Sequence, residues 1–263
     1  MCELLAISAR FPTTISLSFE ELARHGGCDR PHHDGWGVAF VRERDALLIK
    51  EPQPAAHSLM ARFVAQAQIE STTVVSHIRK ATLGGNRFEN THPFSRELGG
   101  RAHVFAHNGS VAPIKGVDLG SFRPHGDTDS EHAFCVLLSR LAPLWRDGKV
   151  PELRHRAQVV AEFAAELRAV GIANFLYADT DALFVHAHRR PKHDDDEPDA
   201  PGLHVLERSC AVELGSVQAA EVSARSQWVY LAATVPLSDE PWRPMEVAEL
   251  AVIQGGQRCT WAP

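Results

Sequence analysis

A cysteine at position 2, just before a short apolar run, is the residue of this sequence best placed to act as a nucleophile. Cys2 precedes Leu4–Ile7, which has the composition of a strand. Because chain ends usually fray, a thiol there is incidental, a lipid anchor, or a nucleophile that uses its own amino group. No apolar leader precedes Cys2, which disfavours the lipid anchor and leaves the other two interpretations open.

Four short stretches carry polar groups suited to chemistry beside a thiol. They are SHIRKATLGG (76–85), AHNGSV (106–111), GDTDSEHAF (126–134) and HHDGWGVAF (32–40). In the first, Arg79 ends an apolar run, where a guanidinium can bind a carboxylate through two hydrogen bonds. An arginine at such a position is, taken alone, more often part of a surface ion pair.

The stretch AHNGSV has two interpretations. Asn-Gly is a common short turn signal, so Asn108 and Gly109 could form the turn of a hairpin. The alternative is that the Asn108 side-chain amide and the Gly109 backbone N–H converge on one point. Two neutral donors arranged in this way make an oxyanion hole.

The other two stretches predict a helix start and a close backbone approach. Asp127 and Thr128 are typical helix caps, which leaves the carboxylate of Asp129 free to pair with an ammonium group. In HHDGWGVAF, Gly35 and Gly37 indicate close approach of the backbone to a neighbour. Asp34 is expected to orient nearby groups rather than to act in catalysis.

The remaining cysteines and the fifteen histidines do not predict a metal or cofactor. The chain has five cysteines, an odd number, and they are widely spaced and lack a CxxC motif. We therefore expect Cys28, Cys135, Cys210 and Cys259 to be small apolar core residues rather than disulfides or zinc ligands. No zinc motif such as HExxH accompanies the histidines. His77, His92 and His107 are expected near the cleft, although no local signature supports a Cys–His pair.

Composition narrows the class of protein. The chain has 263 residues, 44% of them hydrophobic, which suffices for a substantial core in one domain. The net charge is −6 and the basic residues are scattered, so no nucleic-acid surface is expected. No apolar run approaches membrane-spanning length, and Glu3 is incompatible with a signal peptide. We therefore expect a cytosolic protein without membrane contact.

Apolar patterning predicts many strands and few helices. The predicted strands are Leu4–Ser8, Trp36–Arg42, Ala46–Lys50, Thr73–Arg79, His103–His107, Asn174–Ala178, Ala182–His186, Leu203–Glu207, Trp228–Ala233 and Val247–Ile253. The predicted helices are Ser18–His25, opened by a capping box, Ser58–Ala67, Asp129–Leu141 and Leu153–Val170.

The order of these elements is typical of an α+β fold with enough strands for two antiparallel sheets. Phe175–Ala178 and Leu183–His186 read as a hairpin around Asp179 to Asp181. The acidic, proline-containing segment Arg189–Gly202 is expected to be a solvated loop. No linker divides the chain, so residues 1–263 are expected to form one domain.

Taken together, these motifs resemble the class II glutamine amidotransferases, which are N-terminal-nucleophile hydrolases, in their stand-alone bacterial type. MCELLAISA, HHDGWGVAF, SHIRKAT, ENTHPFSREL, AHNG and TDSEHAFC occur in the family's order and spacing over nearly the whole chain. Two stretches depart from the usual pattern: Pro31-His32-His33 replaces an arginine-containing turn, and Leu83-Gly84 stands where His-Gly is common.

The resemblance implies a four-layer αββα sandwich and a role for each matched residue. Met1 would be removed and Cys2 would be the nucleophile. Asn108 and Gly109 would form the oxyanion hole. Arg79, helped by Thr82, would bind the α-carboxylate of glutamine, and Asp129 would bind the α-ammonium. No metal or cofactor is implied.

This chemistry explains a cysteine at position 2. An α-amino group has a pKa of about 7.7–8.0, so part of it is unprotonated at neutral pH and can accept the thiol proton. Attack on glutamine or another γ-glutamyl amide would give a thioester, which water hydrolyses. Three possibilities remain for the function: an amidohydrolase acting alone, a glutaminase subunit that supplies ammonia to a separate synthase, or a glutamine-binding relic with weak turnover.

Overall fold

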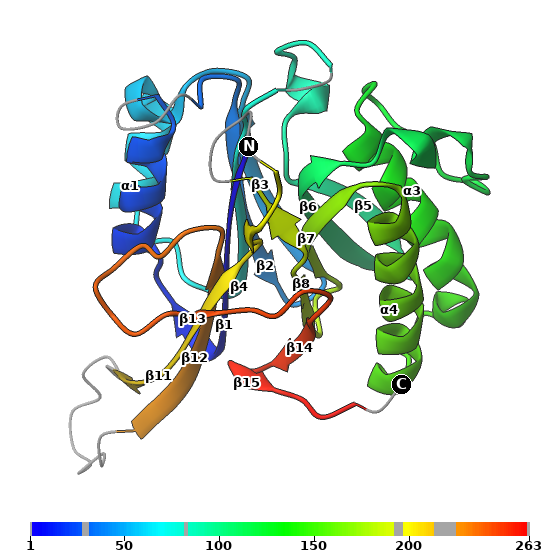
Figure 1. Ribbon diagram of the computed structural model, residues 1–263. Helices are drawn as coiled ribbons and strands as arrows, with labels where there is room; N and C mark the ends of the chain where they lie inside the picture. Colours follow the sequence, from blue (N-terminus) through cyan, green and yellow to red (C-terminus); the bar gives the residue numbers. More distant parts are fainter. Residues whose placement is uncertain (1, 28–31, 82–83, 192–196, 213–224, 262–263) are drawn as a thin grey trace.

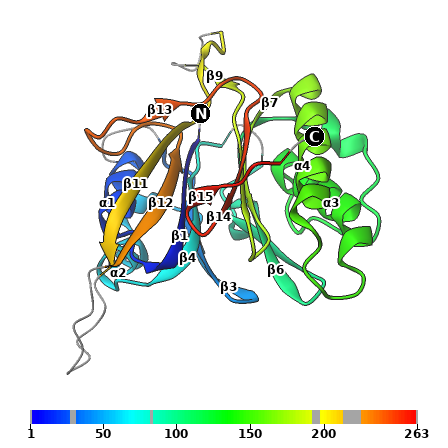
Figure 2. The ribbon, with the colours of Figure 1, turned by 90° about the horizontal axis from the view of Figure 1, so that it is seen from below.

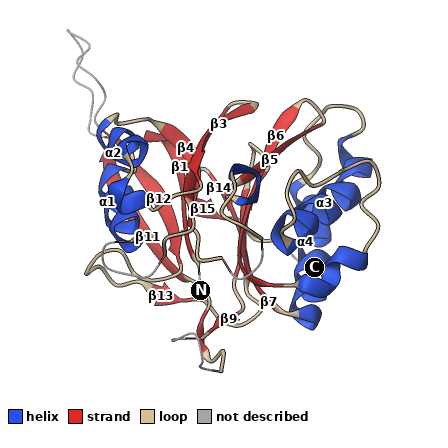
Figure 3. Cartoon of the chain, turned by 90° about the horizontal axis from the view of Figure 1, so that it is seen from above, coloured by secondary structure: helices blue, strands red, loops and turns tan. Residues whose placement is uncertain are grey.

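Two antiparallel sheets pack face to face between outer layers of helices in the computed structural model (Figures 1 and 3). The structure describes residues 2–27, 32–81, 84–191, 197–212 and 225–261. Helices α1 (Ser16–His25) and α2 (Leu59–Gln66) cover one sheet. Helices α3 (Asp129–Leu141) and α4 (Leu153–Val170) cover the other, which completes an αββα sandwich.

The first sheet has seven strands among the described residues, in the order β13-β11-β12-β1-β4-β2-β3. Their bounds are β1 Glu3–Thr13, β2 Trp36–Arg42, β3 Asp45–Glu51, β4 Ser71–Ile78, β11 His204–Val212, β12 Arg225–Ala233 and β13 Arg243–Pro244. β1 is central and pairs with β4 and β12, with Leu4 opposite His77 and Leu5 opposite Ala233.

The second sheet has six described strands in the order β15-β14-β8-β7-β6-β5. They are β5 Phe94–Leu98, β6 Arg101–Ser110, β7 Ile172–Ala178, β8 Leu183–His186, β14 Leu250–Gln254 and β15 Gln257–Arg258. A short ribbon of β9 (Arg189–Arg190) and β10 (Ala200–Pro201) and four 3-10 turns complete the described elements. The turns are η1 Ala55–His57, η2 Phe88–Asn90, η3 Ala112–Gly116 and η4 Ala142–Trp145.

Three apolar cores separate the four layers, and β1 contributes to two of them. Leu4 and Ala6 point between the sheets, whereas Leu5, Ile7 and Ala9 pack toward α1 and α2. A strand buried on both faces needs a continuous apolar run rather than alternation, which is why Leu4–Ile7 is uniformly apolar. The residues that begin β1 are thus held by strand pairing on both edges and by apolar packing on both faces. Figure 2 shows β1 between helix α1 on one side and helices α3 and α4 on the other.

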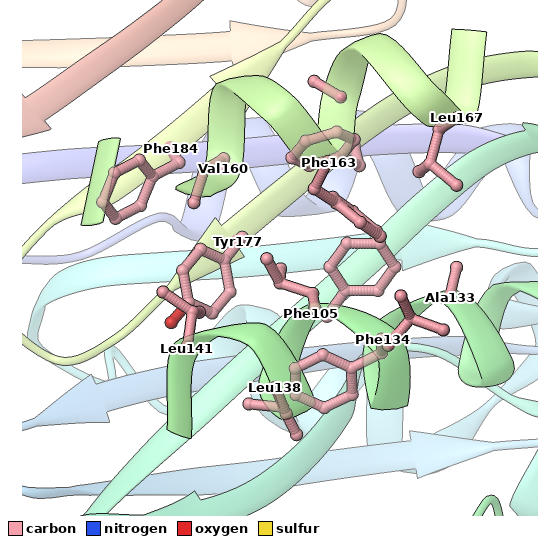
Figure 4. Packing of buried hydrophobic residues seen from close by; sticks show 14 of the residues in the cluster. Phe105, Ala133, Phe134, Leu138, Leu141, Val160, Phe163, Leu167, Tyr177 and Phe184 are labelled. Atoms are coloured by element: carbon pink, nitrogen blue, oxygen red, sulfur yellow. The ribbon is translucent and has the colours of Figure 1, made fainter. Parts of the chain in front are cut away.

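The third core lies between the six-stranded sheet and helices α3 and α4 (Figure 4). Phe105 of β6 stacks on Phe134 of α3 with ring centroids 5.3 Å apart, and it meets Phe163 of α4 edge-on at 6.4 Å. This packing fixes the position of β6 relative to the helices. Asn108 lies three residues after Phe105 on the same strand, so its position is fixed with it.

Most predicted elements are confirmed, with differences at the ends that have physical causes. The first helix begins at Ser16, not at a capping box on Ser18, because Ile15, Phe19 and Leu22 form its buried face and its N-cap makes no side-chain bond. The last long strand begins at Leu250 rather than Val247, since Ala248 has a positive φ of 71° and turns the chain.

Of the two interpretations of Asn108 and Gly109, the structure excludes the hairpin turn, because β6 continues through them to Ser110 and pairs with β7 along its length. The expected loop Arg189–Gly202 contains β9 and β10, paired through Arg190 and Ala200. The hairpin of β7 and β8 is confirmed, as are Cys135, Cys210 and Cys259 as buried or half-buried free thiols; Cys28 lies outside the described residues.

Within the described part of the chain, no helix is both long and apolar enough to span a bilayer.

A buried ion pair joins α4 to the β7–β8 turn and predicts a large stability effect. Arg156 binds Asp179 at 2.7 Å and Asp181 at 2.6 Å, and Arg156 and Asp179 are almost fully buried. Arg156→Met should destabilise the fold by about 3–5 kcal/mol because it leaves a buried carboxylate without its cation. Urea unfolding measures this, with Arg154→Met as control: its pair with Glu152 is exposed and should contribute about 1 kcal/mol or less. Equal losses in the two variants would contradict the prediction.

Candidate active site

Cys2 lies directly before β1, and its thiol is hydrogen-bonded to the turn that follows β4. The thiol donates to the carbonyl of Lys80 and accepts from the backbone N–H of Lys80, each at 3.2 Å. Burial raises the pKa of the half-buried Cys2 thiol, and the Lys80 N–H and the charge of Arg79 oppose this only in part. The thiol is therefore mostly protonated at neutral pH and needs a base to become a nucleophile.

Asp34 organises the turn that holds the thiol. Its Oδ2 accepts from the backbone N–H of Ala81 at 2.7 Å, and its Oδ1 accepts from the side-chain amide of Asn86 at 2.9 Å. The backbones of Asp34, Gly35 and Arg79 also exchange two hydrogen bonds. The motifs HHDGWG and SHIRKAT therefore form one unit beside Cys2, and Asp34 has the orienting position that the sequence predicts.

Gly37 makes the expected close backbone approach. A Cβ added there would lie 2.3 Å from the carbonyl oxygen of His92. Any larger residue would push apart β2 and the segment that carries His92, which borders the site.

Asn108 joins β6 to the start of β1. Its Nδ2 donates to the carbonyl of Cys2 at 2.7 Å and reaches Thr234 Oγ1 only at 3.5 Å. An amide nitrogen has two N–H donors, and the longer contact is at the limit of a hydrogen bond. One donor therefore fixes Asn108 against Cys2, and the other is weakly engaged.

Thr234 is a structural partner that sequence reasoning missed. Its Oγ1 accepts from the Leu4 N–H at 2.9 Å, and its own N–H donates to the Leu4 carbonyl at 3.0 Å. Thr234 thus holds the first residues of β1 in register beside Asn108. It follows directly after β12, so its only sequence signal was a hydroxyl at the end of an apolar strand.

Gly109 needs to be glycine because β7 approaches it closely. A Cβ at this position would lie 1.8 Å from the Ile172 carbonyl oxygen. That oxygen also lies 3.1 Å from His107 Nε2, while His107 Nδ1 lies 2.9 Å from the Ser130 hydroxyl. Gly109 is half-buried and lines the same pocket as Cys2.

Asp129 is the first residue of α3, with Thr128 as the N-cap. Thr128 accepts from the Glu131 N–H at 3.2 Å, as the sequence predicts. The buried Asp129 carboxylate accepts from the N–H groups of Val111 at 2.6 Å and Ser130 at 2.9 Å. Backbone donors and the positive end of the helix dipole stabilise its negative charge, and its remaining lone pairs can accept from a cation.

The Arg79 guanidinium is held by backbone carbonyls. Nη1 donates to Asp34 O at 3.3 Å and Gly85 O at 3.2 Å, and Nη2 donates to Gly84 O at 3.1 Å. These contacts fix the position of a buried positive charge. Thr82, expected to assist Arg79, lies outside the described residues, as does Met1.

One small pocket brings these groups together from five separate segments of the chain. It is lined by Cys2, Arg79, Lys80, Ala81, His92, His107, Gly109, Thr128, Asp129 and Ser130. The thiol is therefore in one pocket with a cation, an anion and an exposed strand backbone. The Asn108 amide contacts its rim through the carbonyl of Cys2. A cation and an anion beside a thiol are charges complementary to the two charged ends of a zwitterion.

The buried histidines around the pocket are neutral. Burial lowers the pKa of His77 to about 3, and it lowers the pKa of His92 and of His107 below their usual range. His77 and His92 pack ring on ring with centroids 4.2 Å apart. Groups with such low pKa values are poor general bases near neutral pH, so they favour no Cys–His pair.

His77 predicts acid sensitivity of the fold. The unfolded residue titrates near 6.5, so between this value and about 3 the unfolded chain binds more protons and stability falls as the pH falls. His77→Phe should reduce the loss of unfolding free energy between pH 7 and pH 5 by up to about 2 kcal/mol. Urea unfolding at the two pH values measures this. Replacement of the exposed His57 by phenylalanine is the control. If the unfolding free energy of His77→Phe depends on pH as that of the wild type does, the prediction is wrong.

The fold defines a class of protein: an αββα sandwich of two antiparallel sheets is the fold of the N-terminal-nucleophile hydrolases, and here a cysteine directly precedes the central strand β1. The comparisons with known proteins agree. The model of the family of class II glutamine amidotransferases matches residues 1–262. This chain belongs to the class II glutamine amidotransferase family.

Relatives match over nearly the full length. The Escherichia coli (strain K12) protein YafJ, provisionally named a glutamine amidotransferase, is 36% identical over 267 residues, covering 98% of this chain and 99% of YafJ. A structure from Pseudomonas aeruginosa PA01, also provisionally assigned as a glutamine amidotransferase, has a TM-score of 0.67 and 31% identity and covers 98% of this chain and 100% of its own. Glutamine phosphoribosylpyrophosphate amidotransferase from B. subtilis shares the fold, with a TM-score of 0.63 and 14% identity over 98% of this chain and 48% of that chain.

Proposed function

We propose that this protein is a glutamine amidohydrolase that releases ammonia, or an amine, from glutamine or another γ-glutamyl amide through a thioester on Cys2. In this proposal residues 1–263 act as one glutamine amidotransferase domain, without a metal or cofactor. The observation that carries the proposal is the single pocket in which Cys2 meets Arg79, Asp129 and Gly109.

The proposed nucleophile is the thiolate of Cys2 after removal of Met1. Because burial raises the pKa of this thiol, attack needs a base. The neutral histidines nearby are unsuited to that role, which favours the amino group of Cys2 itself. The amine takes the thiol proton, Sγ attacks the γ-carbonyl carbon, and the amine then protonates the departing nitrogen. Water hydrolyses the thioester to glutamate, and the thiol is restored.

The proposed oxyanion hole is the weakly engaged N–H of Asn108 with the N–H of Gly109. A tetrahedral oxyanion carries a full negative charge, which two fixed neutral donors stabilise more than they stabilise the ground-state carbonyl. Asn108 Nδ2 donates to the Cys2 carbonyl at 2.7 Å, so its amide is fixed beside the residue that carries the reacting sulfur before substrate binds.

The proposed ligands of the substrate are Arg79 for the α-carboxylate, with Thr82 beside it, and Asp129 for the α-ammonium. Both charges are buried and held by backbone groups, so neither needs to be reorganised to meet a zwitterion. Among the described lining residues we assign no comparable pair of opposite charges to the leaving side, and we therefore expect tolerance toward the amine that departs.

A substrate panel tests these assignments. Charge-assisted hydrogen bonds contribute about 1.5–3 kcal/mol each, so glutamine α-methyl ester and N-acetylglutamine should lose at least about tenfold in kcat/KM. A γ-glutamyl anilide should lose less than either. Equal hydrolysis of glutamine and both α-blocked compounds would show that the roles given to Arg79 and Asp129 are wrong.

Labelling with a diazo-ketone analogue of glutamine tests the nucleophile. Purified protein should lack Met1, release glutamate from glutamine, and gain one covalent adduct on the peptide that begins with Cys2. Mass spectrometry of the intact protein and its N-terminal peptide measures both. Full activity in protein that retains Met1 would contradict the proposed mechanism.

The same measurements separate two alternatives. A subunit that supplies ammonia to a separate synthase would hydrolyse glutamine but reject the bulky anilide, because a synthase must close the leaving side. A glutamine-binding relic would bind glutamine and release almost no glutamate. The carboxylate, thiol and amide present at Asp129, Cys2 and Asn108 favour turnover over the relic.

A further inference from the structure

Asn174 is a fully buried polar residue in the apolar strand β7, and the proposed chemistry does not use it. It pairs directly with Asn108 of β6. Its Nδ2 donates to the Asn108 carbonyl at 3.1 Å and to the Arg189 carbonyl at 3.0 Å. Its Oδ1 accepts from the His188 N–H at 2.7 Å. The side chain thus ties the end of β6 to the chain that leaves β8.

The surrounding chain is built to keep this amide in place. A Cβ at Gly202 would lie 1.7 Å from Asn174 Oδ1, so the chain there can pass only without a side chain. The pairing of β6 with β7 ends two rungs beyond Asn108, at Ser110 opposite Ile172. The residue pairs at the end of a paired strand separate most readily. An additional side-chain hydrogen bond therefore has most effect at this position.

The ladder fixes which way the Asn108–Gly109 peptide points. Asp179 N–H donates across the hairpin to Ala182 O, so odd-numbered residues of β7 direct their backbone groups toward β8 and even-numbered ones toward β6. The Asn108 carbonyl therefore points at Asn174. A trans peptide holds C=O and N–H in opposite directions, so the Gly109 N–H points away from β7.

On that far side β6 has no strand partner among the described residues, because β5 pairs only as far as Phe94 opposite Phe105. Gly109 also lines the pocket of Cys2. We propose that Asn174 is a positioning residue: by holding the Asn108 carbonyl it aims the Gly109 N–H at the oxyanion. This inference rests on the proposed function.

The test compares Asn174→Asp and Asn174→Ala with the wild type in glutamine hydrolysis. Asn174→Asp keeps the acceptor for His188 but loses the donor to Asn108, at nearly unchanged size. Both variants should lose about 10- to 100-fold in kcat, because a displaced oxyanion donor acts only in the transition state. KM for glutamine, the inhibition constant of glutamate and the rate of Cys2 alkylation by iodoacetamide should change by less than about threefold.

Tyr177→Phe is the matched control. Tyr177 lies three residues further along β7, is also buried, and its hydroxyl bonds His103 Nδ1 at 2.7 Å. Tyr177→Phe should lower the melting temperature as the Asn174 variants do, but leave kcat unchanged. A parallel loss of kcat, glutamate binding and alkylation in the Asn174 variants, or an unchanged kcat, would overturn the positioning role alone. A wild-type protein that releases no glutamate would overturn the proposed function and this role with it.

Discussion

Cys2→Ala is expected to abolish glutamate release, with a loss of at least about 10³-fold in kcat, while the protein remains folded. The reason is that the thioester cannot form without sulfur, and the remaining donors act only on an attack that no longer occurs. The fold should survive, because β1 is held by its pairing with β4 and β12 and by apolar packing on both faces. Glutamate release and thermal unfolding measure the two parts of this prediction.

Cys210→Ala is the control for this experiment. Cys210 is also a half-buried free thiol and lies on β11, away from the pocket. This variant should keep both turnover and the diazo-ketone adduct. Residual turnover of Cys2→Ala within about tenfold of the wild type would remove Cys2 from the mechanism.

Asn108→Ala is expected to lower kcat and kcat/KM together by roughly 10²–10³, corresponding to about 2.7–4 kcal/mol of transition-state stabilisation. KM should change little, because the amide contributes once the carbonyl oxygen has become an oxyanion. Steady-state kinetics with glutamine measures both constants.

Asn108 also holds the Cys2 carbonyl, so a second measurement must separate aiming of the nucleophile from stabilisation of charge. Alkylation of the thiol by iodoacetamide forms no oxyanion. Its rate should therefore fall far less than kcat in Asn108→Ala. If alkylation and kcat fall equally, or if KM rises steeply at unchanged kcat, Asn108 is a structural or binding residue instead.

Several elements were predictable because local sequence and burial agree. The apolar run of β1, the Thr128 cap of α3 and the glycine stop after α4 each follow from residue types that permit few alternatives. The strand β5 was not predicted, because Phe94–Leu98 is mostly polar and is extended through its pairing with β6.

The interpretation of Asn108 and Gly109 shows where local signals fail. Asn-Gly by itself favours a turn, yet pairing with β7 extends the strand through both residues. The turn preference is worth little against the hydrogen bonds and packing that a continued strand gains. Asn174 was visible only as a polar residue inside an apolar strand, and nothing local related it to Asn108.

By itself the sequence determined an α+β pattern with strands for two antiparallel sheets and the residues able to do chemistry, because residue types and apolar periodicity are local properties. The order of the motifs gave the family resemblance, and that resemblance implied the αββα sandwich. Only the tertiary structure decided that Cys2, Arg79, Gly109 and Asp129 share one pocket. It also decided which histidines are neutral, since a pKa depends on burial by distant segments. The direction of the Gly109 N–H likewise depends on the tertiary structure, because it is set by pairing between strands whose residues lie more than sixty positions apart in the sequence.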